Sequence, residues 1–300
     1  MSTGPDPRLL DIMMPFYGRP DHFREAVLSV LGQSDSRWRL TIIDDVYPDT
    51  APGDWARALE DPRVTYLRNE TNLRPSRNYN KAIGLAQTEF MVLMGCDDIM
   101  SPRYVQRVHE LIAEFPGSAI IQPGVSVIDE NGAASRPLAD RVKARYRPRG
   151  SGARSLSGEA LASSLLRGNW TYFPSLVWRT ELLRAGQFRT DLDVVQDLAK
   201  LFELIVGGGS LVLDDEVIFN YRRHSRSVSA VTGTDGSKFI QERTFFDEAT
   251  AIANDLGWNK AARIARAHVS SRLNALTELP GAVLRGNGVG IRNLLRHALT

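Results

Sequence analysis

The first 115 residues alternate between short apolar segments and amphipathic segments, and this alternation restricts the fold more than any other feature of the sequence. Strand-like segments occupy residues 9–14, 39–43, 64–67 and 90–94. Segments with helical periodicity separate them; in the first, the apolar residues are Phe23, Ala26, Val27, Val30 and Leu31. Strands that alternate with helices predict an α/β fold, with a mostly parallel sheet covered by helices on both faces.

The pattern changes from residue 119 onward. We expect a strand over residues 119–129, an irregular Gly/Arg/Pro-rich stretch over 136–154, helices over 157–167 and 194–206, and an extended segment over 211–221. Ser101-Pro102 predicts the cap and first residue of a helix before this point. Two amphipathic helices broken near Gly257-Trp258 are expected over residues 238–278, with a short basic helix after them. These patterns predict one domain over residues 1–230, in two halves (1–118 and 119–230), and a C-terminal helical region over 231–300.

Composition and charge exclude several classes of protein. Cys96 is the single cysteine, which excludes an internal disulfide framework and a multi-cysteine metal site. The 37 Lys+Arg nearly balance the 35 Asp+Glu, so the net charge gives no case for nucleic-acid binding. The chain begins without a signal-peptide pattern, and no stretch approaches ~18 uninterrupted apolar residues. We therefore expect a cytoplasmic protein.

Polar residues follow three of the predicted strands, at the edge of a parallel sheet where ligands bind. Asp97-Asp98 follows the most apolar strand. Two adjacent carboxylates at a buried strand end are costly without a cation or donors, and oxygen ligands suit Mg²⁺ or Mn²⁺. The alternative is that one aspartate caps the next helix and the other is solvated. Asp44-Asp45 follows an earlier strand, where an aspartate contacts a base or ribose or simply initiates a turn.

Two later residues have both a structural and a catalytic interpretation. Asp197 lies near the start of a predicted helix, where the exposed N–H groups favour a carboxylate. The same carboxylate could act as a general base towards an acceptor hydroxyl. His224 follows a predicted strand, beside arginines. It either completes a metal site or lies on the surface, and the arginines could clamp phosphate oxygens.

Seven segments in chain order resemble the motifs of family 2 glycosyltransferases, which are inverting, sugar-nucleotide-dependent enzymes with the GT-A fold. They are LDIMMPFYGR (residues 10–19), SVLGQS (29–34), LTIIDD (40–45), NLRPSRN (72–78), Asp97-Asp98 with Pro102, VQD (195–197) and YRRHSRSVS (221–229). The resemblance covers roughly residues 9–230. It implies a GT-A domain whose first half binds the nucleotide and whose second half binds the acceptor.

The resemblance also implies a role for each matching residue. Pro15, Phe16 and Tyr17 would line the base pocket, with Arg19 in the same loop, while Asp45 and Arg77 would hold the base and its surroundings. Asp97 would face the ribose, Asp98 would bind Mn²⁺ or Mg²⁺, and His224 would assist at the metal or the diphosphate. Asp197 would be the catalytic base. The implied donor is a UDP-sugar, with dTDP- or GDP-sugars as alternatives, and the acceptor is a glycan, a lipid-linked sugar or a small molecule.

Some residues depart from the family pattern. Gly95 stands where many members carry the first aspartate of a D-x-D, Val46-Tyr47 replaces a usual Gly-Ser, and Leu73 replaces a usual glycine. Two other functions stay open: a non-catalytic sugar-nucleotide- or glycan-binding relative, and a sugar-phosphate nucleotidyltransferase. The latter usually has a Gly-rich, Lys/Arg-containing loop after the first strand, which this chain lacks.

The remaining expectations concern the acceptor side. Trp170, Tyr172 and Pro174 could contact an acceptor sugar, although aromatic residues are more often core. Residues 136–154 and 260–300 each hold seven basic residues and one acidic residue, so the rest of the chain is acidic. These basic segments would bind an anionic acceptor or make peripheral contact with the inner face of the membrane, or they are solvated surface.

Overall fold

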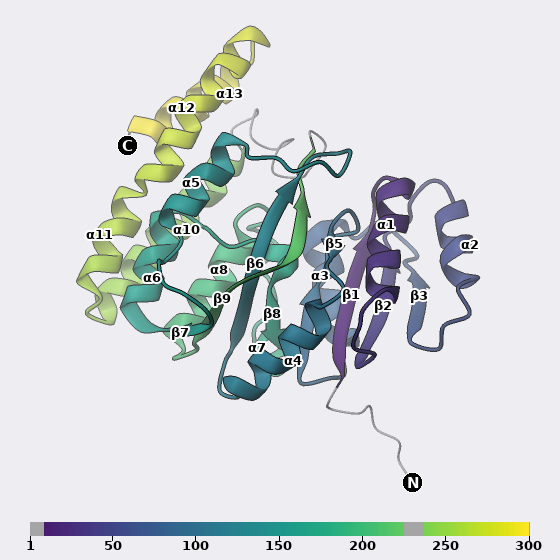
Figure 1. Ribbon diagram of the computed structural model, residues 1–300. Helices are drawn as coiled ribbons and strands as arrows, with labels where there is room; N and C mark the ends of the chain where they lie inside the picture. The colour runs from purple at the N-terminus through teal and green to yellow at the C-terminus, as the bar shows by residue number, and fades with distance from the viewer. Residues whose placement is uncertain (1–8, 225–236, 300) are drawn as a thin grey trace.

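Four parallel strands form the first half of the sheet in the computed structural model, which describes residues 9–224 and 237–299. The strands are β1 (Leu10–Phe16), β2 (Trp38–Asp44), β3 (Val64–Arg68) and β4 (Phe90–Leu93), in the spatial order β3-β2-β1-β4. The helices between them are α1 (Pro20–Leu31), α2 (Ala51–Arg57) and α3 (Arg74–Leu85). The predicted alternation is therefore confirmed (Figure 1).

The second half extends the same sheet in the order β4-β8-β6-β9-β5. β6 (Ile120–Ile128) and β9 (Leu211–Arg222) are parallel, with a register shift around Gly124, while β8 (Val177–Arg179) runs antiparallel between β4 and β6. Two short strands, β5 (Ile99–Met100) and β7 (Arg154–Leu156), pair with β9. The remaining elements of this half are α4 (Tyr104–Glu114), α5 (Leu138–Tyr146), α6 (Gly158–Arg167), η1 (Phe173–Ser175), α7 (Thr180–Ala185) and α8 (Gln196–Val206).

Apolar side chains cover both faces of the sheet. Because side chains alternate along a strand, Met13 of β1 joins one buried cluster, while Ile12 and Met14 join the other. The first cluster includes residues of α3, α6 and α8, and the second includes residues of α1 and α4. The sheet is thus a mixed, mostly parallel one with helices on both faces, as predicted.

Four helices follow the sheet: α10 (Ser237–Asp255), α11 (Asn259–Ala267), α12 (Val269–Leu284) and α13 (Gly288–Leu299). The break expected near Gly257-Trp258 is confirmed, but a second break at His268 makes three helices of the expected two. α10 and α11 contribute Phe245 and other side chains to the first cluster. α12 and α13 form a hairpin that projects beyond the rest of the molecule (Figure 1). In the described part of the chain, no helix is both long and apolar enough to cross a membrane.

Two details of the prediction are wrong. Residues 138–146 form the helix α5 inside the stretch expected to be irregular. The helix expected to begin at Ser101-Pro102 begins at Tyr104, and no side chain caps it, so neither Asp97 nor Asp98 acts as a cap. The division into domains stays a prediction.

Candidate functional site

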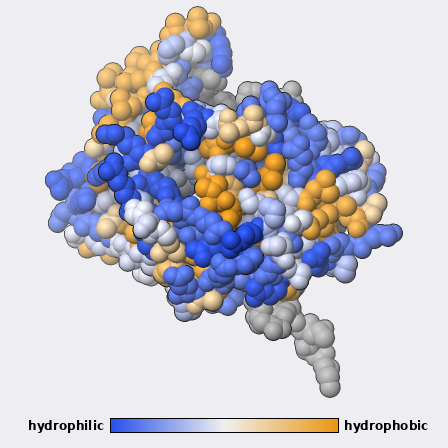
Figure 2. Space-filling view, viewed as in Figure 1, coloured by the Kyte–Doolittle hydropathy of each residue, from blue (hydrophilic) through white to orange (hydrophobic). Residues whose placement is uncertain are grey.

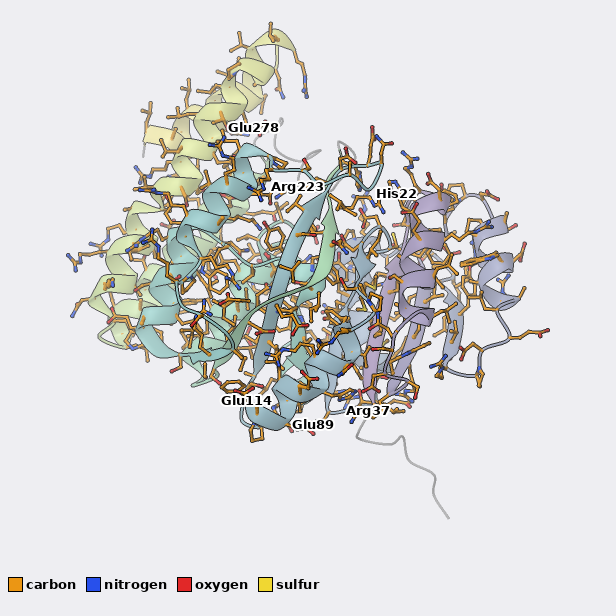
Figure 3. The ribbon with its side chains drawn as sticks, in the orientation of Figure 1. His22, Arg37, Glu89, Glu114, Arg223 and Glu278 are labelled. Atoms are coloured by element: carbon orange, nitrogen blue, oxygen red, sulfur yellow. The ribbon has the colours of Figure 1, made fainter. Side chains whose placement is uncertain are left out.

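Of the residues singled out from the sequence, Asp45, Asp97, Asp98, His224 and the loop Pro15 to Arg19 lie at the carboxyl ends of β1, β2, β4 and β9. Arg77 lies in α3, Asp197 lies in α8, and Trp170, Tyr172 and Pro174 lie before β8. Figure 3 shows His22 and Arg223 at this end of the sheet, and Arg37, Glu89 and Glu114 at the other end. The motif segment that ends at Ser229 is described only up to His224, and Ser225 to Ser229 lie outside the described residues.

Asp44 and Asp45 at the end of β2 are both buried and both engaged within the protein. Asp44 accepts a hydrogen bond from the Tyr47 N–H at 2.7 Å and an ion pair from Arg68 at 2.6 Å, so it initiates the turn. Asp45 Oδ1 accepts bonds from Asn69 Nδ2 and from the Leu73 N–H, both at 2.7 Å. Its Oδ2 accepts the Arg74 N–H at 2.9 Å. Asp45 therefore fixes the loop before α3, and any base contact would use the remaining acceptor capacity of Oδ2.

The loop after β1 presents one exposed aromatic ring. Phe16 is fully buried and stacks on Phe23 with ring centroids 4.0 Å apart, whereas Tyr17 is 56% exposed and packs edge-on against Tyr47 at 5.6 Å. Pro15 is half-buried. Tyr17 and Tyr47 are therefore the rings available to a base, and Tyr47 was noted in the sequence only as a departure from the family pattern.

Three arginines near this loop have different surroundings. Arg19 pairs with Asp21 at 2.5 Å, and both side chains are exposed. Arg77 is exposed and has no ion-pair or hydrogen-bond partner among residues 9–224 and 237–299, so its guanidinium is available to a ligand. Arg74 has a φ of 64°, and Val46 after Asp45 has a φ of 63°. A β-branched residue with positive φ is strained, and such strain concentrates at functional sites.

Asp97, Asp98 and His224 form a compact group between β4 and β9. His224 Nε2 lies 2.6 Å from Asp97 Oδ2. Asp98 Oδ1 accepts the Arg222 N–H at 2.8 Å, but Asp98 Oδ2 is buried and has no hydrogen-bond partner in the described part of the chain. Burial, and then the charge of Asp97, raise the pKa of Asp98 well above its usual value. The site therefore favours a cation or a proton at this carboxylate.

Gly95 leaves the space that the Asp98 carboxylate occupies. A Cβ atom at residue 95 would lie 2.4 Å from Asp98 Oδ2 and 3.0 Å from Asp97 Oδ1. The absence of an aspartate at this position is therefore coupled to the position of Asp98, because the two side chains cannot share the space.

Arg222 is the residue here whose role the sequence did not reveal. Its side chain is 1% exposed, and its Nε donates to the Asp97 carbonyl at 2.7 Å. The guanidinium also donates to the Glu130 carbonyl at 3.2 Å and pairs with Glu25 at 2.5 Å. Arg223 makes a bidentate pair with Asp140, both bonds at 2.8 Å. Both guanidiniums are thus engaged inside the protein, and Arg222 fastens the Asp97-Asp98 loop.

Asp197 lies in the first turn of α8, as predicted. Its Oδ2 accepts a hydrogen bond from Asn169 Nδ2 at 2.8 Å. The Asn169 side chain is oriented by Thr171, whose hydroxyl donates to Asn169 Oδ1 at 2.6 Å. No residue in the described part of the chain bonds Asp197 Oδ1, so this oxygen is free to accept a proton.

The candidate acceptor residues differ in exposure. Trp170 is 1% exposed and belongs to the first buried cluster, and its Nε1 donates to Ser164 Oγ at 2.9 Å, so its ring is mainly a core residue. Tyr172 and Pro174 are half-buried. The Tyr172 hydroxyl donates to Asp140 at 3.0 Å, and its ring packs against Tyr221 at 5.2 Å.

A divalent metal fits this donor set in part. The unpartnered oxygen of Asp98, the charge of Asp97 and the ring of His224 supply a carboxylate-rich site. Across residues 9–224 and 237–299, however, no cluster of three or more Asp, Glu, His or Cys side chains is arranged to hold a metal ion. The protein would therefore supply few ligands, and a bound diphosphate and waters would supply the others.

The mixed, mostly parallel sheet with helices on both faces has the GT-A architecture. The sequence model of Glycosyl transferase family 2 matches residues 11–167, more than half of the chain, and the protein belongs to this family.

Individual relatives agree with this classification. The chain is 36% identical over 95 residues to WcaA of Escherichia coli, which covers 31% of this chain and 34% of WcaA. It is 25% identical over 222 residues to the succinoglycan biosynthesis protein ExoO of Rhizobium meliloti, covering 73% of this chain and 62% of ExoO. The matched segments thus span less than two thirds of either relative. The crystal structure of S. aureus TarS residues 1–349 superimposes with a TM-score of 0.68 at 14% identity, covering 97% of this chain and 81% of TarS 1–349. This similarity shows the fold.

Proposed function

We propose that this glycosyltransferase moves a sugar from a UDP-sugar to an acceptor hydroxyl by a single displacement with inversion of the anomeric carbon. The observation that carries the proposal is the buried, unpartnered Asp98 oxygen beside Asp97 and His224, which suits a metal-bound diphosphate. TarS, which shares the fold, has been solved with UDP and with UDP-GlcNAc. We extend the uridine nucleotide from TarS to this chain as part of the proposal.

The nucleotide would lie across the carboxyl ends of β1 and β2. Tyr17 and Tyr47 offer the exposed rings for the base, and Arg77 offers an unpaired guanidinium. Asp97 would accept from the ribose through its Oδ1, since His224 occupies its Oδ2. Asp98 and His224 would hold Mn²⁺ or Mg²⁺. When bound, such a metal offsets the charge that develops on the departing diphosphate.

Asp197 would act as the general base of the transfer. Asn169 fixes one carboxylate oxygen and leaves the other free, which orients the group without neutralising it. A carboxylate held in this way takes the proton of the acceptor hydroxyl as that oxygen attacks the sugar. The acceptor is a glycan, a lipid-linked sugar or a small molecule.

The test is turnover of a panel of sugar nucleotides with Mn²⁺ or Mg²⁺, using wild type and Asp197→Asn. We expect Asp197→Asn to lower kcat at least 100-fold while the affinity for UDP changes less than twofold. Asp191→Asn is the matched control, because Asp191 is an exposed carboxylate just before α8 that pairs with Arg189. Near-normal turnover by Asp197→Asn would refute the role of Asp197. UDP binding by the wild type without turnover of any donor would support a non-catalytic relative.

We also propose that the α12–α13 hairpin contacts an anionic membrane surface. Val283, Leu284 and Val289 near its turn are 59%, 87% and 58% exposed, and Arg285 lies among them. Hydrophobic residues gather along this projecting hairpin (Figure 2). Exposed apolar residues beside cationic ones are typical of interfacial binding. Binding to anionic vesicles that is lost at high salt is the expected result, and no binding at low salt would refute the contact.

A further inference from the structure

A cavity of about 160 Å³ lies between α5, β6 and β9, next to the candidate acceptor residues. Its lining includes Gln122, Lys143, Arg147, Trp170, Tyr172 and Asp215. In Figure 2 hydrophobic residues gather over β6, with hydrophilic residues beside them over α5. Val125, Val217 and the aromatic side chains supply the apolar part of the lining, and Lys143, Arg147 and Asp215 supply its charged wall.

Lys143 is the most unusual group in this wall. Its Nζ donates to the Thr171 carbonyl at 2.7 Å and lies 4.6 Å from the centre of the Tyr172 ring. No carboxylate of the described residues comes within ion-pair distance of Nζ. Burial, and then the charge of Arg223, lower the pKa of Lys143 to about 8, while Asp197 and Asp140 oppose this effect. An ammonium has three N–H donors, so two remain for a ligand.

The other charges of the cavity are predominantly positive. Asp215 is the carboxylate of the lining, and it is shared by Arg147 at 2.6 Å and Arg154 at 2.9 Å. Arg154 Nε is buried without a hydrogen-bond partner in the described part of the chain. The lining itself therefore carries two cations, Lys143 and Arg147, against the one carboxylate of Asp215, which leaves an excess of positive charge. Arg147 is held in place by Asp215 and by the Asp214 carbonyl, to which it donates at 2.7 Å.

The same wall is connected to the proposed catalytic base. Thr171, whose carbonyl accepts from Lys143, orients Asn169, which in turn bonds Asp197. The bidentate pair between Asp140 and Arg223 anchors α5 beside Tyr172 and Tyr221. The charge of Asp197 also acts on Lys143, so the proposed base and the cavity are close to each other.

We infer that this cavity binds an anionic group of the acceptor, a phosphate ester or a carboxylate, through Lys143 and Arg147. The inference rests on the proposed function, because it places the anion on the molecule whose hydroxyl Asp197 activates. The cavity also divides the basic residues of segment 136–154 into two groups. Lys143, Arg147 and Arg154 are partly buried around the cavity, while Arg136, Arg141, Arg145 and Arg149 are exposed.

The chain has five lysines, which makes Lys143 observable by NMR after reductive ¹³C-methylation. Lys143→Arg assigns its resonance. The full-length protein is titrated with glycerol phosphate, with glucuronate and with neutral glycerol, in each case with and without saturating UDP and Mg²⁺ to occupy the donor site. Lys260, which is exposed, reports nonspecific anion binding.

We expect the Lys143 resonance to shift saturably with glycerol phosphate, with glucuronate or with both, and not with glycerol. A shift with only one of the two anions assigns the acceptor's charged group to that class, and a shift with both supports an anion site that takes either group. Arg147→Gln should weaken this binding at least fivefold, because it removes the second cation. Arg145→Gln, which removes an exposed arginine of α5, should leave the affinity for the anion unchanged.

Two results would overturn the inference: no shift of Lys143 with either anion, or a linear shift parallel to that of Lys260, which indicates an adventitious ion only. If Arg147→Gln does not fold, Arg154→Gln tests the same excess of positive charge. Failure of UDP to bind would count against the proposed function. The titration without UDP would still test the anion site.

Discussion

Adding a side chain at Gly95 should disturb both stability and the binding of metal and nucleotide. A Cβ atom there would lie 2.4 Å from Asp98 Oδ2, well inside van der Waals contact. Asp98 cannot simply turn away, because its side chain is buried and its Oδ1 accepts the Arg222 N–H at 2.8 Å. Either that hydrogen bond or the local backbone must change.

The expected loss of stability follows from these contacts. Overpacking of a well-packed site costs about 1–3 kcal/mol, so Gly95→Ala should lower Tm by about 2–10 °C. Gly95→Asp restores the family's aspartate but adds a third carboxylate beside Asp97 and Asp98. Two like charges about 4 Å apart repel by about 4 kcal/mol at an effective dielectric constant of about 20. Gly95→Asp should therefore be less stable than Gly95→Ala at pH 7.

The assays are thermal unfolding and calorimetric titration with UDP and Mn²⁺. Both variants should bind UDP with Mn²⁺ at least tenfold more weakly than wild type, because the Asp98 carboxylate is displaced. Gly84→Ala in α3 is the matched control: nothing lies within 4 Å of its added Cβ, so neither Tm nor affinity should fall. An unchanged Tm and an unchanged affinity of Gly95→Ala would refute the placement of Asp98 over Gly95.

Three other perturbations follow from the geometry. Asp45→Ala removes an acceptor of three hydrogen bonds and should lower the free energy of unfolding by about 2–4 kcal/mol in a denaturant titration, whereas an exposed control in α10, Asp247→Ala, should not. Arg222→Met leaves Glu25 and three carbonyls without their donor and should lower the free energy of unfolding by about 3–5 kcal/mol; a loss below about 1 kcal/mol would contradict this role of Arg222. Burial lowers the pKa of His297 to about 4 from its ordinary 6.5, so the unfolded chain binds more protons there and stability falls as the pH drops from about 6.5 to 4. Hydrogen exchange of α13 should rise over this range in wild type and less in His297→Gln.

The first half of the fold could be predicted because its information is local. Each of β1 to β4 is a mainly apolar run, and polar or turn-forming residues follow it directly in the sequence. Short elements in the second half gave no such pattern. β8 has only three residues, and its place between β4 and β6 depends on pairing with strands far away in the sequence.

Helix α5 was missed because it does not pack through an apolar stripe. Its Leu138 and Val142 are 68% and 40% exposed, and it is anchored instead by Asp140 and Lys143. Polar anchoring of this kind has no periodic signature in the sequence.

The sequence predicts where the candidate site lies better than it predicts the hydrogen bonds within the site. The motifs predict that Asp97, Asp98 and His224 lie at one edge of the sheet, where β4 and β9 end. The hydrogen bonds within this group depend on residues remote in the sequence. Arg222 joins Glu25 and Glu130 to the Asp97-Asp98 loop, and no single segment encodes that arrangement.

The most direct test of the account is calorimetric titration of UDP into the wild type and Asp98→Asn, with Mn²⁺ and then with EDTA. We expect EDTA to weaken UDP binding to the wild type at least tenfold. We also expect Asp98→Asn to bind UDP weakly under both conditions. Equal UDP affinity in all four titrations would contradict a metal-assisted diphosphate site at Asp97, Asp98 and His224.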